Sequence, residues 1–87
     1  MTILYHTRFE KRVKKLSRSD VESLADKIEM FADDPFNIIF RNHALHGIYD
    51  GYRSIDIKGN LLALYKEERP DVVRFCYLGT HHELYGK

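Results

Sequence analysis

Hydrophobic residues recur every three or four positions up to residue 34, which is the spacing of amphipathic helices. A short apolar run at residues 3–5 precedes them and predicts a strand. Thr7 and Glu10 form a capping-box pattern that predicts the start of a first helix. Ser19 and Glu22 repeat this pattern and predict the start of a second helix. That helix is expected to end before Pro35, because the residue preceding a proline is pushed out of the α region.

The hydrophobic period falls to about two from residue 36 onward, which is the spacing of β-strands. Four segments fit strands: residues 43–47, 52–57, 61–65 and 72–78. Turn signals separate them, namely Asp50-Gly51, Lys58-Gly59-Asn60 and Pro70. Thr80 and Glu83 form a third capping box, which predicts a final helical turn.

This order of elements predicts an α+β fold, with an N-terminal strand and a helical hairpin packed on a small twisted antiparallel sheet. A chain of 87 residues is short for one domain, so residues 1–87 are expected to form a single domain. Six tyrosines and five phenylalanines are enough to build one core. Cys76 is the only cysteine in the sequence, so an internal disulfide is excluded.

The sequence shows no sign of a membrane segment. No apolar run approaches the roughly 20 residues that a membrane-spanning helix needs. The first six residues, MTILYH, lack the basic region and apolar stretch of a signal peptide. We therefore expect a cytoplasmic protein that does not associate with membranes.

The charges are segregated along the chain, although the net charge is only +1. Residues 7–18 carry cations against Glu10 alone: Arg8, Lys11, Arg12, Lys14, Lys15 and Arg18. Residues 20–34 carry carboxylates against Lys27 alone: Asp20, Glu22, Asp26, Glu29, Asp33 and Asp34. A dipolar surface of this kind steers a polyanion or an acidic partner. Two solvated helix faces explain the same pattern equally well.

Several short motifs in the second half resemble the YafQ branch of the RelE/ParE toxin superfamily. They are residues 42–47 (NHALHG), 51–53 (GYR), 62–66 (LALYK), 74–75 (RF), 79–81 (GTH) and 84–85 (LY). Each motif is weak alone, but their common order and spacing are specific. The resemblance implies a RelE-like fold and a type II toxin that cuts mRNA in the ribosomal A site, without a metal or other cofactor. It also implies a cognate antitoxin that wraps around the toxin, with operator DNA contacted only through that antitoxin.

The resemblance carries the family's catalytic roles onto three residues: His43, the proton-donating His81 and the terminal aromatic Tyr85. Other positions depart from the YafQ pattern. Asp56 stands where the pattern has a second histidine, and Asn60-Leu61 stands where it has Asp-Trp. Tyr77 stands where the pattern has a catalytic arginine on the final strand. The resemblance therefore leaves room for a weak or altered activity.

Metal-free RNA cleavage needs a base for the 2′-hydroxyl, an acid for the leaving 5′-oxygen and positive charge near the phosphorane. Histidine suits the first two roles, because it exchanges protons near neutral pH. We expect His81 to be the acid, since the positive end of the last helical turn favours proton donation. His43 is expected to be a base or a phosphate ligand, and Asp56 to orient one of the two histidines. Asn60 and Tyr85 complete the catalytic candidates.

The predicted RNA contacts are Arg53, Lys58, Tyr77, Lys11, Lys14 and Lys15, and Lys87 is a further available cation. The three lysines lie off the apolar face of the first helix, so they are expected to be exposed. A second interpretation applies to Arg53 and Arg74, which fall out of phase with Asp56 and Tyr77 on their strands. On that interpretation both arginines pair with the acidic second helix.

Some aromatic and histidine residues are not expected to take part in chemistry. Tyr52 and Tyr65 are expected in the core rather than at RNA. His81 and His82 do not suit a metal, because adjacent side chains diverge and no acidic or cysteine ligand has a fitting spacing.

Two other functions fit the same fold. A ParE-like toxin poisons DNA gyrase and has no need of proton transfer, so His43 and His81 favour the nuclease. A degenerate toxin acts only as an antitoxin-binding module, which agrees with the absent Asp-Trp and arginine. Growth arrest with in-frame mRNA cuts identifies the nuclease, supercoiling defects identify the gyrase poison, and normal growth identifies the inert module.

Overall fold

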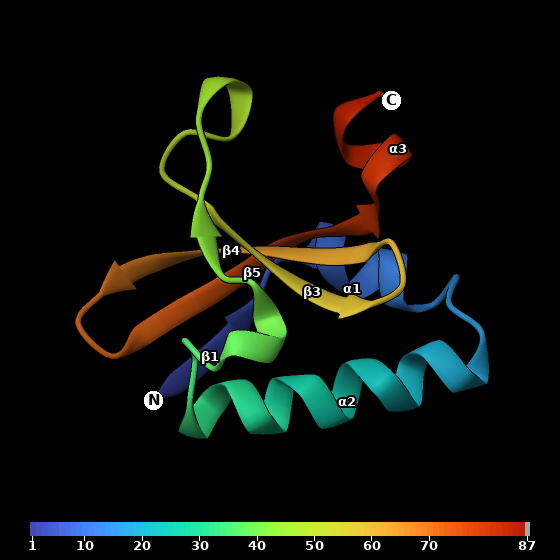
Figure 1. The fold of residues 1–87 in the computed structure, drawn as a ribbon, viewed down its shortest axis with the longest axis horizontal. Helices are drawn as coiled ribbons and strands as arrows, with labels where there is room; N and C mark the ends of the chain where they lie inside the picture. Colours follow the sequence, from blue (N-terminus) through green and yellow to red (C-terminus); the bar gives the residue numbers. More distant parts are fainter. Residues whose placement is uncertain (87) are drawn as a thin grey trace.

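A computed structural model describes residues 1–86, whose elements follow the order that the hydrophobic pattern predicts (Figure 1). The elements are β1 (Thr2–Tyr5), α1 (Thr7–Val13), α2 (Arg18–Asp33), the 3₁₀ helix η1 (Ile38–Phe40), β2 (His43–Ala44), the 3₁₀ helix η2 (Gly47–Tyr49), β3 (Arg53–Lys58), β4 (Leu61–Arg69), β5 (Val72–Thr80) and α3 (His81–Tyr85). Lys87 lies outside the described residues. Within residues 1–86, no helix has both the length and the apolar character needed to cross a bilayer.

The sheet is mixed rather than wholly antiparallel. Its five strands lie in the order β1-β5-β4-β3-β2, and each neighbouring pair from β2 to β5 is antiparallel. The N-terminal strand joins the sheet parallel to β5, with Ile3 opposite Val73. A parallel pair needs a long connection, and β1 and β5 are separated by most of the chain. The α+β fold is confirmed, while β1 is part of the sheet instead of packing on it.

The caps predicted for α1 and α2, Thr7 and Ser19, both lie later in the sequence than the observed caps. His6 caps α1, because its Nδ1 atom accepts from the Arg8 N–H at 3.0 Å. Ser17 caps α2, because its hydroxyl accepts from the Asp20 N–H at 3.1 Å. A cap residue needs extended backbone, which His6 and Ser17 have, whereas Thr7 is already helical. The capping box of Thr80 and Glu83 at α3 is confirmed, with both of its hydrogen bonds present.

One face of the sheet carries the main core, covered by α1, α2 and η1. Phe31 of α2 lies at its centre and has no exposed surface. Its ring meets those of Phe40, Tyr65 and Phe75 edge-on, with centroid separations of 5.9, 4.9 and 5.3 Å. Edge-to-face contacts of this kind add to the apolar burial. The expectation that Tyr65 belongs to the core is confirmed.

Within residues 1–86, the other face of the sheet is covered mainly by two short pieces, η2 and α3. Figure 1 shows both on the side of the sheet opposite α2. Tyr49 of η2 packs with Leu62 and Leu64 of β4, and Leu84 and Tyr85 of α3 pack against them. The Tyr49 hydroxyl donates to the Leu84 carbonyl at 2.7 Å, which joins the two pieces. The openings on either side of this bridge contain most of the predicted site residues.

Replacing the central phenylalanine tests the main core. Phe31→Ala is expected to lower the free energy of unfolding by about 3–5 kcal/mol, because it leaves a cavity among three aromatic rings. Met30→Ala is the matched control on the same helix, since Met30 is 39% exposed, and we expect a loss below about 1 kcal/mol. Urea denaturation of both variants measures the difference. Equal losses would show that Phe31 is not central.

Candidate active site

A hollow with a volume of about 940 Å³ lies between β2 and α3, and we call it the histidine hollow. All five catalytic candidates predicted from the sequence line it: His43, Asp56, Asn60, His81 and Tyr85. They come from β2, from β3 and the turn that follows it, and from α3. The structure therefore brings together residues that are far apart in the sequence.

The His43 ring is oriented by the backbone just before it. Its Nδ1 atom lies 2.7 Å from the carbonyl oxygen of Arg41. A carbonyl oxygen only accepts hydrogen bonds, so this contact requires the proton on Nδ1. In the neutral ring, Nε2 then keeps its lone pair free to accept a proton. The geometry therefore suits His43 to act as a base through Nε2.

Arg41 supplies a cation that the sequence analysis missed. Its Nε atom lies 3.2 Å from Asp56 Oδ2, and both residues line the histidine hollow. The partner of the Asp56 carboxylate is thus an arginine instead of the expected histidine. Arg41 has a left-handed backbone with φ of 48°, which is uncommon for a residue with a side chain. The only signal in the sequence was its place beside the Asn42-His43 motif.

His81 is fixed to the hollow at two points. It is the first residue of α3, and its backbone N–H donates to the Asn60 carbonyl at 3.1 Å. Its ring packs on Tyr85, one helical turn later, with centroids 4.8 Å apart. Asn60 therefore holds His81 through its main chain, and Tyr85 supports the ring of His81.

A buried hydroxyl completes the wall of the hollow. Ser54 is 1% exposed, and its Oγ atom has no hydrogen-bond partner among residues 1–86. Burial raises the pKa of Tyr85, and the nearby Tyr49 raises it further. The Ser54 hydroxyl offsets part of that rise in the Tyr85 pKa without reaching hydrogen-bond geometry. The Ser54 Oγ atom is itself enclosed, so this hydroxyl belongs to the wall of the hollow and interacts with Tyr85 rather than with solvent.

Neither arginine of the alternative interpretation pairs with α2, so that prediction is wrong. Arg53 donates from Nε to Asn42 Oδ1 at 2.8 Å and lies over the Phe36 ring. Arg74 instead forms an ion pair with Glu68 at 2.6 Å. The carboxylates in the middle of α2, Asp26 and Glu29, are exposed to solvent.

Lys58 also lies away from the histidine hollow. Its Nζ atom is 3.2 Å from Asp20 Oδ1 and donates to the Ser19 hydroxyl at 2.8 Å. These contacts tie Lys58 to the first turn of α2. Of the cations predicted to bind RNA, Arg53 and Lys58 are thus engaged within the fold.

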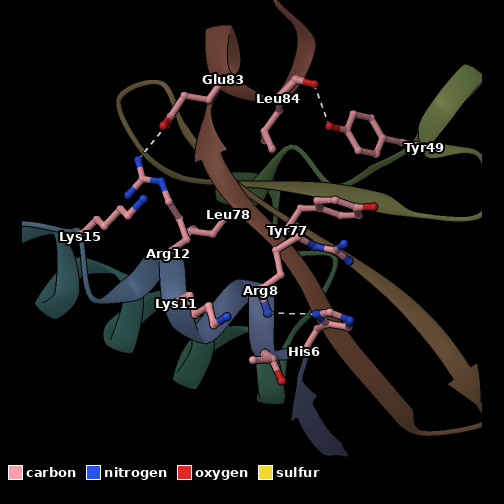
Figure 2. Close-up of a pocket in the computed structure, with 11 residues that line it drawn as sticks. His6, Arg8, Lys11, Arg12, Lys15, Tyr49, Tyr77, Leu78, Glu83 and Leu84 are labelled. Carbon is pink, nitrogen blue, oxygen red and sulfur yellow. Dashed lines mark hydrogen bonds and ion pairs between the residues drawn. The ribbon is translucent and has the colours of Figure 1, made fainter.

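A second opening, which we call the basic groove, lies between α1 and α3 over β5 and has a volume of about 630 Å³ (Figure 2). Its cations are Arg8, Lys11, Arg12 and Lys15, and its carboxylate is Glu83. The Arg8 guanidinium lies 4.0 Å above the Tyr77 ring, and its Nε donates to the Cys76 carbonyl at 3.0 Å. Stacking under a cation places Tyr77 in this groove rather than in the histidine hollow.

The three lysines predicted to bind RNA from the first helix do not lie together. Helix α1 ends at Val13, so Lys14 and Lys15 lie just beyond it. Lys11 and Lys15 line the basic groove, whereas Lys14 lines an apolar cleft between α1 and α2. All three lysines are exposed, as expected.

Glu83 links α3 to α1 across the basic groove, as Figure 2 shows. Its Oε1 atom accepts from Arg12 Nη2 at 2.8 Å and from the Thr80 N–H at 2.8 Å. These two hydrogen bonds lower the pKa of Glu83 to about 2, and the one from Arg12 has the larger effect. Glu83 is therefore ionised at every pH at which the protein is expected to work.

The sequence of residues 1–86 matches the family described as "Bacterial toxin of type II toxin-antitoxin system, YafQ". The chain belongs to the YafQ family. This match covers nearly the whole chain and confirms the resemblance drawn from the motifs. No curated protein matches the sequence significantly.

Solved structures of YafQ and related toxins share the fold. YafQ from E. coli strain BL21(DE3) is 25% identical, with a TM-score of 0.82 and 97% of each chain covered. The E. coli DinJ-YafQ complex gives 25% identity, a TM-score of 0.79 and 97% coverage of each chain. A YoeB/ParE toxin from Agrobacterium tumefaciens is 18% identical over 93% of this chain and 99% of its own, with a TM-score of 0.76. The last likeness shows the fold alone.

The described residues contain no cluster of metal ligands. Within residues 1–86, no three His, Cys, Asp or Glu side chains lie close enough together to hold a metal ion. The histidine hollow does contain His46 as well as His43 and His81.

Acid titration tests the ion pair of Glu83. The pKa of Glu83 is about 2 in the folded chain, against an ordinary value of 4.5. Its stabilising contribution is therefore complete above pH 4.5 and is lost as the pH falls toward 2. Glu83→Gln keeps an acceptor for Thr80 but has no charge. Urea unfolding from neutral to acid pH should show the variant less stable above pH 4.5, with the gap closing as the pH falls. A gap independent of pH would contradict the assignment.

Proposed function

We propose that this YafQ-family toxin is an endoribonuclease that cuts mRNA in the ribosomal A site, with its histidines as acid and base and no metal. The observation that carries the proposal is the histidine hollow. There, His43 and His81 lie with a cation, Arg41. This combination offers proton transfer and charge at one place, which RNA cleavage requires and a gyrase poison does not.

In the proposed reaction the 2′-oxygen of the substrate attacks the neighbouring phosphorus. His43 Nε2 accepts the proton of the 2′-hydroxyl, since Nδ1–H is held by the Arg41 carbonyl. His81 donates a proton to the 5′-oxygen as the phosphorus–oxygen bond breaks. The products are a 2′,3′-cyclic phosphate and a 5′-hydroxyl. Each proton transfer of this type contributes roughly 10²–10⁴-fold to the rate.

Arg41 is proposed to stabilise the charge that develops on the phosphorane. Donors and cations fixed before the reaction stabilise a transition state strongly, because they need no reorganisation. Asp56 forms an ion pair with Nε of Arg41 at 3.2 Å, which orients the guanidinium and leaves its other nitrogens for phosphate.

An antitoxin is the proposed protein partner of this chain. The E. coli relative with 25% identity has been solved as a DinJ-YafQ complex. We propose that a cognate antitoxin binds this toxin in the cytoplasm, and that operator DNA is reached only through it. The ribosome and its mRNA are the remaining proposed partners.

The proposed RNA contacts beyond the hollow are Lys11, Lys15 and Tyr77 of the basic groove. Lys11 and Lys15 are exposed, while Arg8 covers one face of the Tyr77 ring. Lysine contacts to phosphate depend on salt, because binding releases counterions from the RNA. Lys14 is excluded from this set, since it lies at the α1–α2 cleft.

Replacing His81 tests the catalytic proposal. His81→Ala should reduce single-turnover cleavage of ribosome-bound mRNA by about 10²-fold, because the leaving oxygen loses its acid. His82→Ala is the matched control, since His82 is the next residue and does not line the hollow. Cleavage is measured in excess EDTA, and the cut ends are analysed for a 2′,3′-cyclic phosphate.

Three results would overturn this proposal. One is full activity of a folded His81→Ala protein, and another is a strict requirement for Mg²⁺ in the cleavage step. The third is growth arrest with supercoiling defects and intact mRNA, which would identify a gyrase poison.

Two neighbouring lysines test the RNA contacts. Lys15→Glu should weaken ribosome association and reduce the slope of log affinity against log salt by about one. Lys14→Glu makes the same charge change one residue earlier but faces the apolar cleft, so its effect should be much smaller. Antitoxin affinity should be nearly unchanged by Lys15→Glu, since an apolar interface depends little on salt. Loss of antitoxin binding with normal ribosome binding would reassign Lys15 to inhibition.

A further inference from the structure

The short helix α3 carries His81 but cannot be stable by itself. It has five residues, and an isolated helix in water needs roughly 12–15 residues to form even marginally. Its position must therefore come from contacts with the rest of the protein. Two of them are hydrogen bonds already described: Asn60 accepts from the His81 N–H, and Tyr49 donates to the Leu84 carbonyl.

The third contact is an ion pair, and it reaches α3 from a different element. Arg12 of α1 donates to Glu83 at 2.8 Å, with exposed fractions of 22% and 47% for the two side chains. The same Glu83 oxygen accepts from the Thr80 N–H, so one atom joins α1 to the capping box of α3. This arrangement connects the basic groove to the helix that carries His81.

We propose that Arg12 and Glu83 are positioning residues: their ion pair holds α3 against α1 and so keeps the His81 ring in the histidine hollow. The catalytic part of this proposal rests on the proposed ribonuclease function. Glu83 stands two residues after His81 in a single turn, so a shift of Glu83 moves His81 with it. Tyr85, whose ring supports that of His81, belongs to the same helix.

The packing around Glu83 leaves little freedom for α3 to settle elsewhere. Gly79 of β5 packs against Glu83. A Cβ atom at Gly79 would be only 3.2 Å from Glu83 Oε1 and 3.4 Å from Leu84 Cγ, so the glycine allows this close contact. The carboxylate is therefore seated closely on β5 while it binds Arg12. A partly exposed ion pair makes a small contribution to the stability of the whole fold, and its effect is larger on α3, which is a local unit with few contacts. In such a unit a weak tether changes the open population by roughly fivefold.

The first experiment measures the hydrogen exchange of the α3 amides. Arg12→Met should speed exchange at Glu83 and Gly86, whose amides are hydrogen-bonded within α3, by roughly fivefold. Arg74→Met is the matched control, because it removes a comparable ion pair between Arg74 and Glu68, whose atoms are 2.6 Å apart. That pair lies toward the start of β5, away from α3, so the control should leave the α3 amides unchanged.

The second experiment separates positioning from RNA binding. Arg12→Met should lower the maximal single-turnover rate by roughly fivefold, with little change in the half-saturating ribosome concentration. Arg12→Lys should recover part of the rate, since it restores the charge. Glu83→Gln should act through the same pair, so the double variant should be no slower than Arg12→Met alone.

The following results of these two experiments would overturn the proposal. Unchanged α3 exchange in Arg12→Met would show that the pair does not hold the helix. Faster exchange with an unchanged maximal rate would show that His81 does not depend on it. A change confined to the half-saturating concentration would make Arg12 an RNA contact. If the wild-type chain does not cut RNA, the ribonuclease function fails, and the exchange comparison alone then decides whether Arg12 and Glu83 hold α3.

Discussion

The first half of strand β4, residues 61–65, is buried on both faces, and this constraint decides where a site can form. Leu62 and Leu64 face away from α1 and α2, yet they are 8% and 0% exposed. Leaving such side chains in water would cost roughly 1.5–3 kcal/mol each, so the second face of the sheet also needs a cover. Helices α1 and α2 already cover the first face, so the apolar cover of the second face comes mainly from η2 and α3. Because both pieces are short, they leave the histidine hollow on one side and the basic groove on the other.

The second cover depends on polar contacts as much as on apolar area. The Tyr49–Leu84 hydrogen bond joins its two halves, and the Arg12–Glu83 ion pair ties one half to α1. Such contacts are directional, so they fix α3 in one place with little buried surface. A helix held in this way opens more readily than the core, while its orientation when closed is well defined. Those properties suit a helix that carries a proposed catalytic histidine.

The sequence predicted what depends on local patterns. Element order, the α3 capping box and the core role of Tyr65 follow from periodicity and spacing, although the same kind of pattern placed the caps of α1 and α2 one and two residues too late. The family motifs indicated catalytic roles for His43, His81 and Tyr85, and these roles stay predictions. Features that depend on distant parts of the chain were missed or wrong. The parallel pairing of β1 and the partners of Arg53 and Arg74 depend on which strands become neighbours. Arg41 was missed because its direction follows from a left-handed backbone that its residue type does not predict.

Two departures from the YafQ pattern, Tyr77 and Asp56, lie in different openings, but an arginine from another element contacts each of them. Tyr77 stands where the pattern has an arginine, and Arg8 of α1 covers its ring. A cation from another element, Arg41, lines the histidine hollow instead. Asp56 alone would repel a phosphate there, but its contact with Arg41 at 3.2 Å offsets that charge and orients the guanidinium. Under the proposed chemistry, the aspartate that stands in place of a histidine is thus the residue that holds the cation proposed to act on the phosphate.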